Sequence, residues 1–187
     1  MYIDLTIEVT PELREEVLSN EKRTVGGHIG THFDVMDKKF PLEYIKRAGI
    51  VFDVSDINAN EIKPSDIDLK RVHKDMFVAF YSNFLNKVGY GTKKYFKEHP
   101  QLSKELIDKL LTKNISIIGI DFAGIRRPEE HTEMDHYCAD KGVFIVENLI
   151  NLEKILENSK SGRFTAHTYP LKYSEMTGLP CRVVAEV

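Results

Sequence analysis

Four apolar runs, each about the length of one β-strand, constrain the fold of this chain more than any other feature. They lie at residues 50–54, 76–81, 115–121 and 143–147. The run at 115–121 is apolar over most of its length, which is typical of a central strand covered on both faces. Residues 103–113 place leucines and an isoleucine in one helical stripe, as expected of a helix that packs on a sheet. These patterns predict one α/β domain over residues 1–187, with a mixed sheet core and flanking helices.

Weaker patterns predict the remaining elements. Further strands are expected at residues 3–8, 28–36, 164–171 and 180–187, and short helices at 10–18, 40–49 and 150–156. Thr10 followed by Pro11 is typical of a helix start, because proline is tolerated at the first helical position. Gly49 is expected to end the helix that begins at Phe40.

Residues 27–34 concentrate side chains that bind metals. His28, His32 and Asp34 are spaced i, i+4, i+6, and residues at even spacing on a strand share one face. Two neutral imidazoles and a carboxylate suit a borderline divalent ion such as Zn²⁺ or Mn²⁺. The same residues could instead form a solvated polar face of the strand. Spacing alone does not decide between these two interpretations.

Glu147 ends an apolar strand, where a buried carboxylate is unfavourable unless it is paired or binds a metal. It could be a metal ligand or the ion-pair partner of Arg126 or Arg127. These arginines belong to a highly charged loop that also carries His131, and the three residues are candidates for substrate binding. The arginines could clamp a substrate carboxylate through bidentate hydrogen bonds, or pair with the acidic residues of the same loop.

Asp135 and His136 lie on the next predicted helix. Asp135 is the fourth residue of a capping-box pattern that starts at Thr132, so its role could be confined to the helix end. His136 could bind a metal or carry a proton, although a histidine on a helix surface is more commonly solvated.

The totals exclude several classes of protein. The chain has 187 residues, and a chain of this size buries about 70% of its unfolded surface on folding. Its 26 basic and 29 acidic residues give a net charge of -3, which does not favour binding to nucleic acid. It has no apolar run near the roughly 20 residues that span a membrane, and no signal-peptide pattern, so a cytoplasmic location is expected. Cys138 and Cys181 are then expected to be reduced thiols without a catalytic role.

Several motifs occur in order along the chain. Residues 28–38, HIGTHFDVMDK, are similar to H-x-G-T-H-x-D-x-P-x-H, the hallmark of the cyclase family that includes the bacterial kynurenine formamidases. Further similarity to that family lies at residues 4–6, 95–96, 99–100, 119–121, 147–152, 170–172 and 178–183. The chain thus resembles the family along nearly its whole length. It departs from the hallmark at Met36, in place of proline, and at Lys38, in place of the last histidine.

The resemblance implies a swivelling β/β/α fold, a bound divalent metal and a homo-oligomer, either a dimer or a tetramer. It implies that His28, His32 and Asp34 hold one ion, with Zn²⁺ the first expectation and Mn²⁺ or Fe²⁺ the alternatives. In the family, a later histidine and the glutamate that matches Glu147 help to hold a second ion, bridged by the aspartate. Asp135 stands where that histidine belongs and is expected to be a ligand in its place.

The resemblance also implies an enzyme acting on a small molecule. In the family's hydrolases the last hallmark histidine is a general acid/base. Lys38 could replace it as a base only if its pKa falls from about 10.4, and otherwise would stabilise an oxyanion or a substrate carboxylate. The expected reaction is metal-dependent hydrolysis of a formamide, with N-formylkynurenine from tryptophan breakdown as the reference substrate, or of a cyclic amide. Lys38 or His136 would move the proton. The alternative is a non-catalytic metal- or ligand-binding protein on the same fold.

Overall fold

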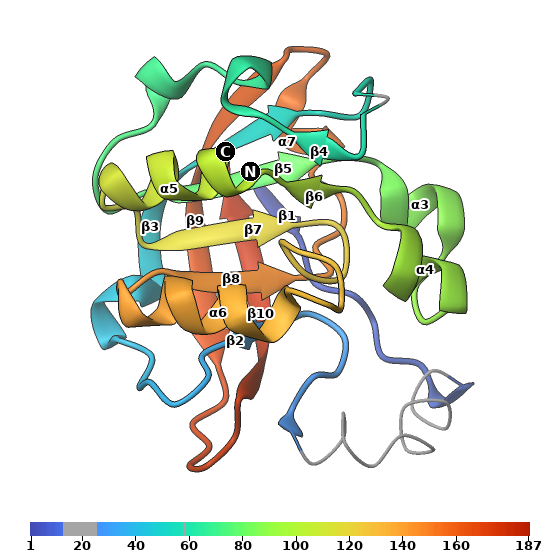
Figure 1. The fold of residues 1–187 in the computed structure, drawn as a ribbon, viewed down its shortest axis with the longest axis vertical. Helices are drawn as coiled ribbons and strands as arrows, with labels where there is room; N and C mark the ends of the chain where they lie inside the picture. Colours follow the sequence, from blue (N-terminus) through green and yellow to red (C-terminus); the bar gives the residue numbers. More distant parts are fainter. Residues whose placement is uncertain (13–25, 58) are drawn as a thin grey trace.

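A closed sheet forms the centre of the protein (Figure 1). The computed structural model describes residues 1–12, 26–57 and 59–187. The strands of the sheet are β1 (Tyr2–Asp4), β2 (His32–Asp34), β3 (Lys46–Asp53), β5 (Phe77–Tyr81), β7 (Ile117–Ile120), β8 (Phe144–Glu147), β9 (Ser161–Pro170) and β10 (Gly178–Glu186). Their order is β1-β10-β2-β8-β7-β5-β3-β9, and β9 also pairs with β10, which closes the ring. A separate ladder joins β4 (Glu61–Ile62) to β6 (Gln101–Leu102).

The four apolar runs form the parallel half of this sheet, because β3, β5, β7 and β8 pair in parallel. Alternate side chains of these strands enter two apolar clusters. Phe77 and Ala79 of β5 pack inside the ring, whereas Val78 and Phe80 pack on its outer face. Every residue of β7 is buried, which confirms the expected central strand.

The helices are α3 (Phe84–Val88), α4 (Lys93–Glu98), α5 (Lys104–Thr112), α6 (His131–Asp140) and α7 (Glu153–Leu156). Figure 1 shows α5 and α6 on the same side of the sheet, with α6 in front of β8. Leu106 and Ile107 of α5 and Met134 of α6 join the outer apolar cluster. The predicted stripe on α5 is therefore confirmed as core, and the N-cap Ser103 accepts a hydrogen bond from the Leu106 amide.

Three local expectations differ from the structure. The helix expected at residues 40–49 is wrong: a short 3₁₀ turn at Leu42–Ile45 leads directly into β3. Gly49 lies within that strand. A Cβ there would come 2.6 Å from the Phe164 ring, so a glycine is needed for close packing and does not mark a helix end. The strand expected at 28–36 shortens to β2, and the one at 3–8 shortens to β1. The helix expected at 10–18 falls mostly outside the described residues.

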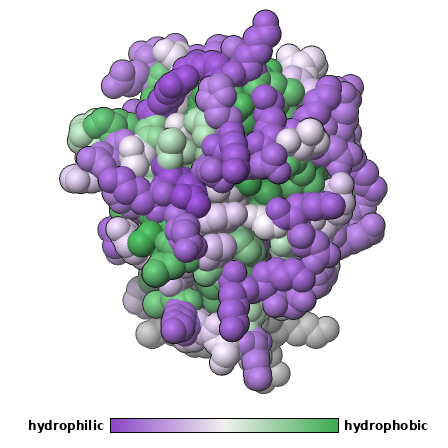
Figure 2. Space-filling model, turned by 90° about the vertical axis from the view of Figure 1, so that its left-hand side faces the viewer, coloured by the Kyte–Doolittle hydropathy of each residue, from purple (hydrophilic) through white to green (hydrophobic). Residues whose placement is uncertain are grey.

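Figure 2 shows one face on which hydrophilic residues predominate, with apolar patches between them. Within the three described ranges, none of the helices is both long enough and apolar enough to cross a lipid bilayer.

Candidate metal centre

Strand β2 positions two of the predicted ligands. It lies between β10 and β8, and its three residues are all buried. Phe33 points into the apolar interior of the ring, so strand alternation places His32 and Asp34 together on the other face. The His32 Nε2 atom lies 3.6 Å from Asp34 Oδ1.

His28 reaches the same point from a turn, not from the strand. Gly27 has a φ of +81°, and a Cβ on it would lie 2.1 Å from the carbonyl oxygen of Gly178, so only glycine fits this turn. The turn brings His28 Nδ1 to 3.0 Å from Asp34 Oδ1 and 3.1 Å from His32 Nε2. One ligand atom from each of the three residues therefore converges on one point.

The other nitrogen of each imidazole is held by the protein. His28 Nε2 lies 2.8 Å from the Thr177 hydroxyl, and His32 Nδ1 lies 2.9 Å from the Gly30 carbonyl oxygen. Because a carbonyl only accepts, His32 Nδ1 donates to Gly30 and Nε2 is the atom that faces Asp34. Hydrogen bonds of this kind fix the ring orientation and tautomer of metal-binding histidines.

Asn148 helps to fix the position of His32 through a shared hydrogen-bond acceptor. Its Nδ2 donates to the Gly30 carbonyl oxygen at 2.7 Å, the same oxygen that meets His32. Its own Oδ1 accepts from the Tyr95 hydroxyl at 2.5 Å, and its carbonyl accepts from the Thr31 hydroxyl at 2.8 Å. Asn148 was not proposed as a site residue from the sequence, although it lies in the family-like segment 147–152.

A second group of candidate ligands lies next to the first and shares Asp34 with it. Glu147 of β8 pairs in register with His32 of β2, and Glu147 Oε2 lies 3.6 Å from His32 Nε2. On α6, His131 Nε2 lies 2.9 Å from Asp135 Oδ2 and 3.4 Å from Glu147 Oε1. Ligand atoms of Asp34, His131 and Asp135 all lie within 4.8 Å of one another. His131, expected to bind substrate from the charged loop, thus lies among the candidate ligands.

Several carboxylate oxygens of this cluster have no hydrogen-bond donor among the described residues. Both oxygens of Asp34, both of Asp135, and Oε1 of Glu147 are buried and accept no hydrogen bond from the described residues. Burial raises the pKa of Asp135 to about 6 and that of Glu147 well above its usual value. Burial would also raise the pKa of Asp34, but the charges and contacts of His32 and His28 lower it. Three buried carboxylates beside imidazole nitrogens fit a divalent cation.

The pKa of His131 responds to the same carboxylates. Burial alone would lower it, but contact with Asp135 and the charges of Glu147, Asp135 and Asp34 raise it to about 10. A protonated His131 therefore supplies positive charge to the cluster when no cation is present.

The capping-box interpretation of Asp135 is wrong. Helix α6 begins at His131 with Glu130 as N-cap, so Thr132 lies inside the helix and cannot cap it. Asp135 is 1% exposed and faces the cluster. His131 and Asp135 are spaced i, i+4 and therefore share one helix face, a signal that the sequence contains.

The arginines of the charged loop lie apart from this cluster. Arg126 is buried and donates to Glu61 at 2.7 Å, to the Leu102 carbonyl at 2.8 Å and to Glu130 at 2.9 Å. Arg126 therefore does not form the suggested ion pair with Glu147. Its guanidinium N–H groups are already used in these contacts and are not available to clamp a substrate carboxylate. Arg127 donates to the His99 carbonyl and lines a cavity of about 210 Å³ that none of the candidate ligands lines.

Lys38 and His136 both lie near Asp37 at the surface. Lys38 Nζ lies 2.7 Å from Asp140 and 3.1 Å from Asp37, and these two contacts raise its pKa. The lowered pKa that a lysine base requires is therefore not produced here. His136 is 49% exposed, with Nδ1 4.0 Å from Asp37 Oδ1.

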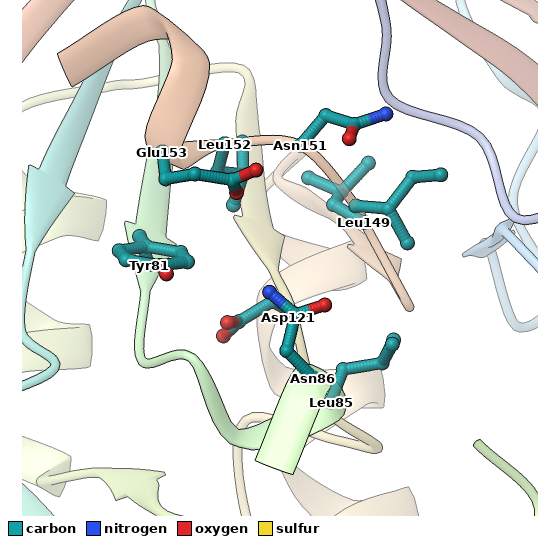
Figure 3. A pocket seen from close by; sticks show the side chains of 9 residues that line it. Tyr81, Leu85, Asn86, Asp121, Leu149, Asn151, Leu152 and Glu153 are labelled. Atoms are coloured by element: carbon teal, nitrogen blue, oxygen red, sulfur yellow. The ribbon is translucent and has the colours of Figure 1, made fainter. Parts of the chain in front are cut away.

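Asp121 is a buried carboxylate with a different environment. It accepts hydrogen bonds from the Ser82 hydroxyl at 2.6 Å, the Ser82 amide at 3.0 Å and the Asn83 amide at 2.7 Å. Figure 3 shows it beside a small pocket that Tyr81 and Glu153 also line. Burial raises the pKa of Asp121 to about 6, against the effect of these hydrogen bonds. The carboxylate links the ends of β5 and β7.

Cys138 and Cys181 are both free and buried. Burial raises the pKa of each thiol, which disfavours the nucleophilic thiolate form.

The sequence profile of the family described as Putative cyclase matches residues 3–126. The chain belongs to the cyclase family. No curated protein matches this cyclase-family sequence.

Solved structures resemble this cyclase-family chain over nearly its whole length. A potential metal-dependent hydrolase with cyclase activity is 23% identical, with a TM-score of 0.71 over 99% of this chain and 96% of the other. A predicted metal-dependent hydrolase from Bacillus stearothermophilus is 21% identical, with a TM-score of 0.72 over 99% and 97%. Isatin hydrolase A from Labrenzia aggregata is 20% identical, with a TM-score of 0.77 over 99% and 93%. These likenesses establish the fold, and the swivelling β/β/α fold implied by the resemblance is confirmed.

Proposed function

We propose that this cyclase-family protein is a metal-dependent hydrolase of small amides. The observation that carries the proposal is the convergence of His28 Nδ1, His32 Nε2 and Asp34 Oδ1 on one point, beside buried carboxylates without hydrogen-bond donors among the described residues. The names of the similar structures, two of them metal-dependent hydrolases, support it. His28, His32 and Asp34 are the proposed ligands of one ion, with Glu147 adjacent.

A divalent ion bound there would lower the pKa of a water molecule and polarise the carbonyl of an amide. The chain's own residues set the geometry. Thr177 and the Gly30 carbonyl fix the two imidazole rings, and Asn148 holds that carbonyl in place. The site is thus preorganised before any substrate arrives.

Two surface residues complete the proposal. Lys38 stays protonated, so its proposed contribution is positive charge that attracts an anionic group of the substrate. His136 is exposed, and its proposed role is to exchange a proton with solvent. Arg127 remains a proposed substrate contact, whereas Arg126 is committed to Glu61 and Glu130.

The proposed substrate is a formamide on an aromatic amine, such as N-formylkynurenine, or a cyclic amide. The neighbours named isatin hydrolase support the second option, because isatin contains a cyclic amide next to an aromatic ring. Zn²⁺ is the first choice of metal, and Mn²⁺ or Fe²⁺ suits the same nitrogen and oxygen ligands. A homo-oligomer of single-domain chains in the cytoplasm is also part of this proposal.

The test uses protein loaded separately with Zn²⁺, Mn²⁺ and Fe²⁺, and measures hydrolysis of N-formylkynurenine, isatin and a wider panel of amides and lactones. We expect turnover that Asp34→Asn abolishes and that Asp121→Asn, a matched change of a buried carboxylate, retains. Full metal loading without turnover of any compound would instead identify a non-catalytic metal-binding protein.

A further inference from the structure

The cavity of about 210 Å³ lies at the carboxyl ends of β3 and β5. Val54 directly follows β3, Ser82 directly follows β5, and both line it. Ligands of α/β sheets commonly bind beyond the carboxyl ends of parallel strands. The Ser82 hydroxyl donates to Asp121 at 2.6 Å, so this wall of the cavity is fixed to the sheet. The candidate metal ligands do not belong to the described lining, and the cavity is therefore a separate place for a ligand.

One part of the lining is apolar. Val54 and Ile62 are buried members of the outer apolar cluster, and Phe84 packs against the same cluster. We call these three side chains the apolar floor. Apolar side chains beside an open recess are stabilised when an apolar group of a ligand covers them. The apolar floor therefore favours a ligand with an apolar body.

Two basic side chains, Lys87 and Arg127, line the same cavity. Neither forms an ion pair with any residue that the structure describes. Glu98 is the one acidic residue of the described lining, and it is exposed. The lining thus carries a net charge of about +1, which favours a ligand with a single negative charge over a doubly charged phosphate.

The chain orients Arg127 before any ligand binds. Its amide donates to Gln101 Oε1 at 3.1 Å, and its side-chain Nε donates to the His99 carbonyl at 3.1 Å. The two terminal nitrogens of the half-buried guanidinium have no acceptor among the described residues. A planar guanidinium with two free nitrogens matches the two oxygens of a carboxylate.

We propose that this cavity binds a small monocarboxylic acid with an apolar body. The carboxylate binds Arg127 and Lys87, and the body of the acid lies on the apolar floor. Pockets for drug-sized ligands measure about 300–1,000 Å³, so a cavity of about 210 Å³ fits a smaller molecule, such as an acid with one ring. The site does not depend on hydrolysis at the metal centre.

The test is calorimetric titration of the full chain with three probes: phenylacetate, the uncharged 2-phenylethanol with the same ring, and inorganic phosphate. We expect one phenylacetate per chain, bound at least about 10-fold more tightly than either other probe. In Arg127→Met the preference for phenylacetate over 2-phenylethanol should disappear, because the carboxylate loses its main partner. Lys87→Met, at an exposed position where folding is not at risk, should weaken phenylacetate binding in the same direction by a smaller factor.

Arg163→Met is the matched control, because Arg163 is an exposed arginine of β9 that does not line the cavity, and it should keep the wild-type affinity. Asp34→Asn should keep it too. Loss of phenylacetate binding in Asp34→Asn would place the acid at the metal centre, with or without a contact to Arg127, and would overturn the cavity site. Absence of binding to the wild type would also overturn it, and tighter binding of phosphate would overturn the assignment to a carboxylate.

Discussion

Asp34 and Asp121 are both buried carboxylates at strand ends, and they differ in what their oxygens meet. Three donors from Ser82 and Asn83 satisfy Asp121, whereas Asp34 faces imidazole nitrogens and accepts no hydrogen bond from the described residues. Burial alone therefore does not mark a functional carboxylate. A carboxylate whose hydrogen bonds are satisfied by the fold stabilises the structure, whereas a buried carboxylate left without donors is suited to binding a cation.

The largest effect is expected for Asp34→Asn. The variant removes the carboxylate shared by both ligand groups, so metal affinity should fall at least about 100-fold and hydrolysis should be lost. The metal-free variant should unfold at a lower temperature, because it loses the contacts with His32 and His28 that lower the pKa of Asp34. Calorimetric metal titration and thermal unfolding test these outcomes, and unchanged metal affinity would contradict them.

Asp121→Asn should have the opposite profile. An asparagine presents an NH₂ group where Asp121 accepts hydrogen bonds, so we expect a loss of about 1–3 kcal/mol in the free energy of unfolding. Metal content should not change. Chemical denaturation and elemental analysis measure the two quantities, and loss of metal would show that the two carboxylates do not differ as described.

Asn148→Ala examines the support behind the first ligand group. Loss of the hydrogen bond to the Gly30 carbonyl should loosen His32 and weaken metal binding about 10- to 100-fold. Asn151→Ala is a close control, because Asn151 also has a positive φ and donates through Nδ2 to a carbonyl, that of Asp4. Equal losses of metal affinity in both variants would indicate a general effect on stability.

The stability of the metal-free protein should depend on pH through His131 of the candidate metal centre, in a pH range above that in which Asp121 titrates. The pKa of His131 is raised from 6.5 to about 10, so its contribution to stability is complete below about pH 6.5 and is lost as the pH rises through 10. Asp135 and Asp121, with pKa values raised from 3.8 to about 6, lose their contributions only between pH 3.8 and 6. Tm measured in a chelator should therefore fall between pH 6.5 and 10, and His131→Ala should flatten that part of the curve. A steep fall in the variant would assign the effect to another group.

The smallest effect on the fold is expected for Lys38→Met. Exposed ion pairs stabilise proteins weakly, so Tm should change little. Lys160→Met is a matched control, because Lys160 bridges Asp53 and Asp56 at the same 3.1 and 2.7 Å at which Lys38 meets Asp37 and Asp140. If Lys38 attracts an anionic substrate, KM should rise in Lys38→Met only. An unchanged KM would remove Lys38 from the proposed site.

The parallel half of the sheet was predictable because each of its strands is a continuous apolar run. Closure of the ring by β9 and β10 was not predictable, since pairing between distant strands leaves no local pattern in the sequence. In the cluster, the hallmark gave His28, His32 and Asp34, but His131 was assigned to a loop because the helix start was placed at Thr132. One residue of error at a helix boundary hid the i, i+4 relation of His131 to Asp135.

The position of β2 also bears on when the site forms during synthesis. This strand carries His32 and Asp34, but its two neighbours, β8 and β10, come from the last third of the chain. On the ribosome, an early segment therefore waits unpaired until the final strand has emerged. Metal loading should accordingly be a late event, which follows the synthesis of β8 and β10 and does not guide the first folding steps.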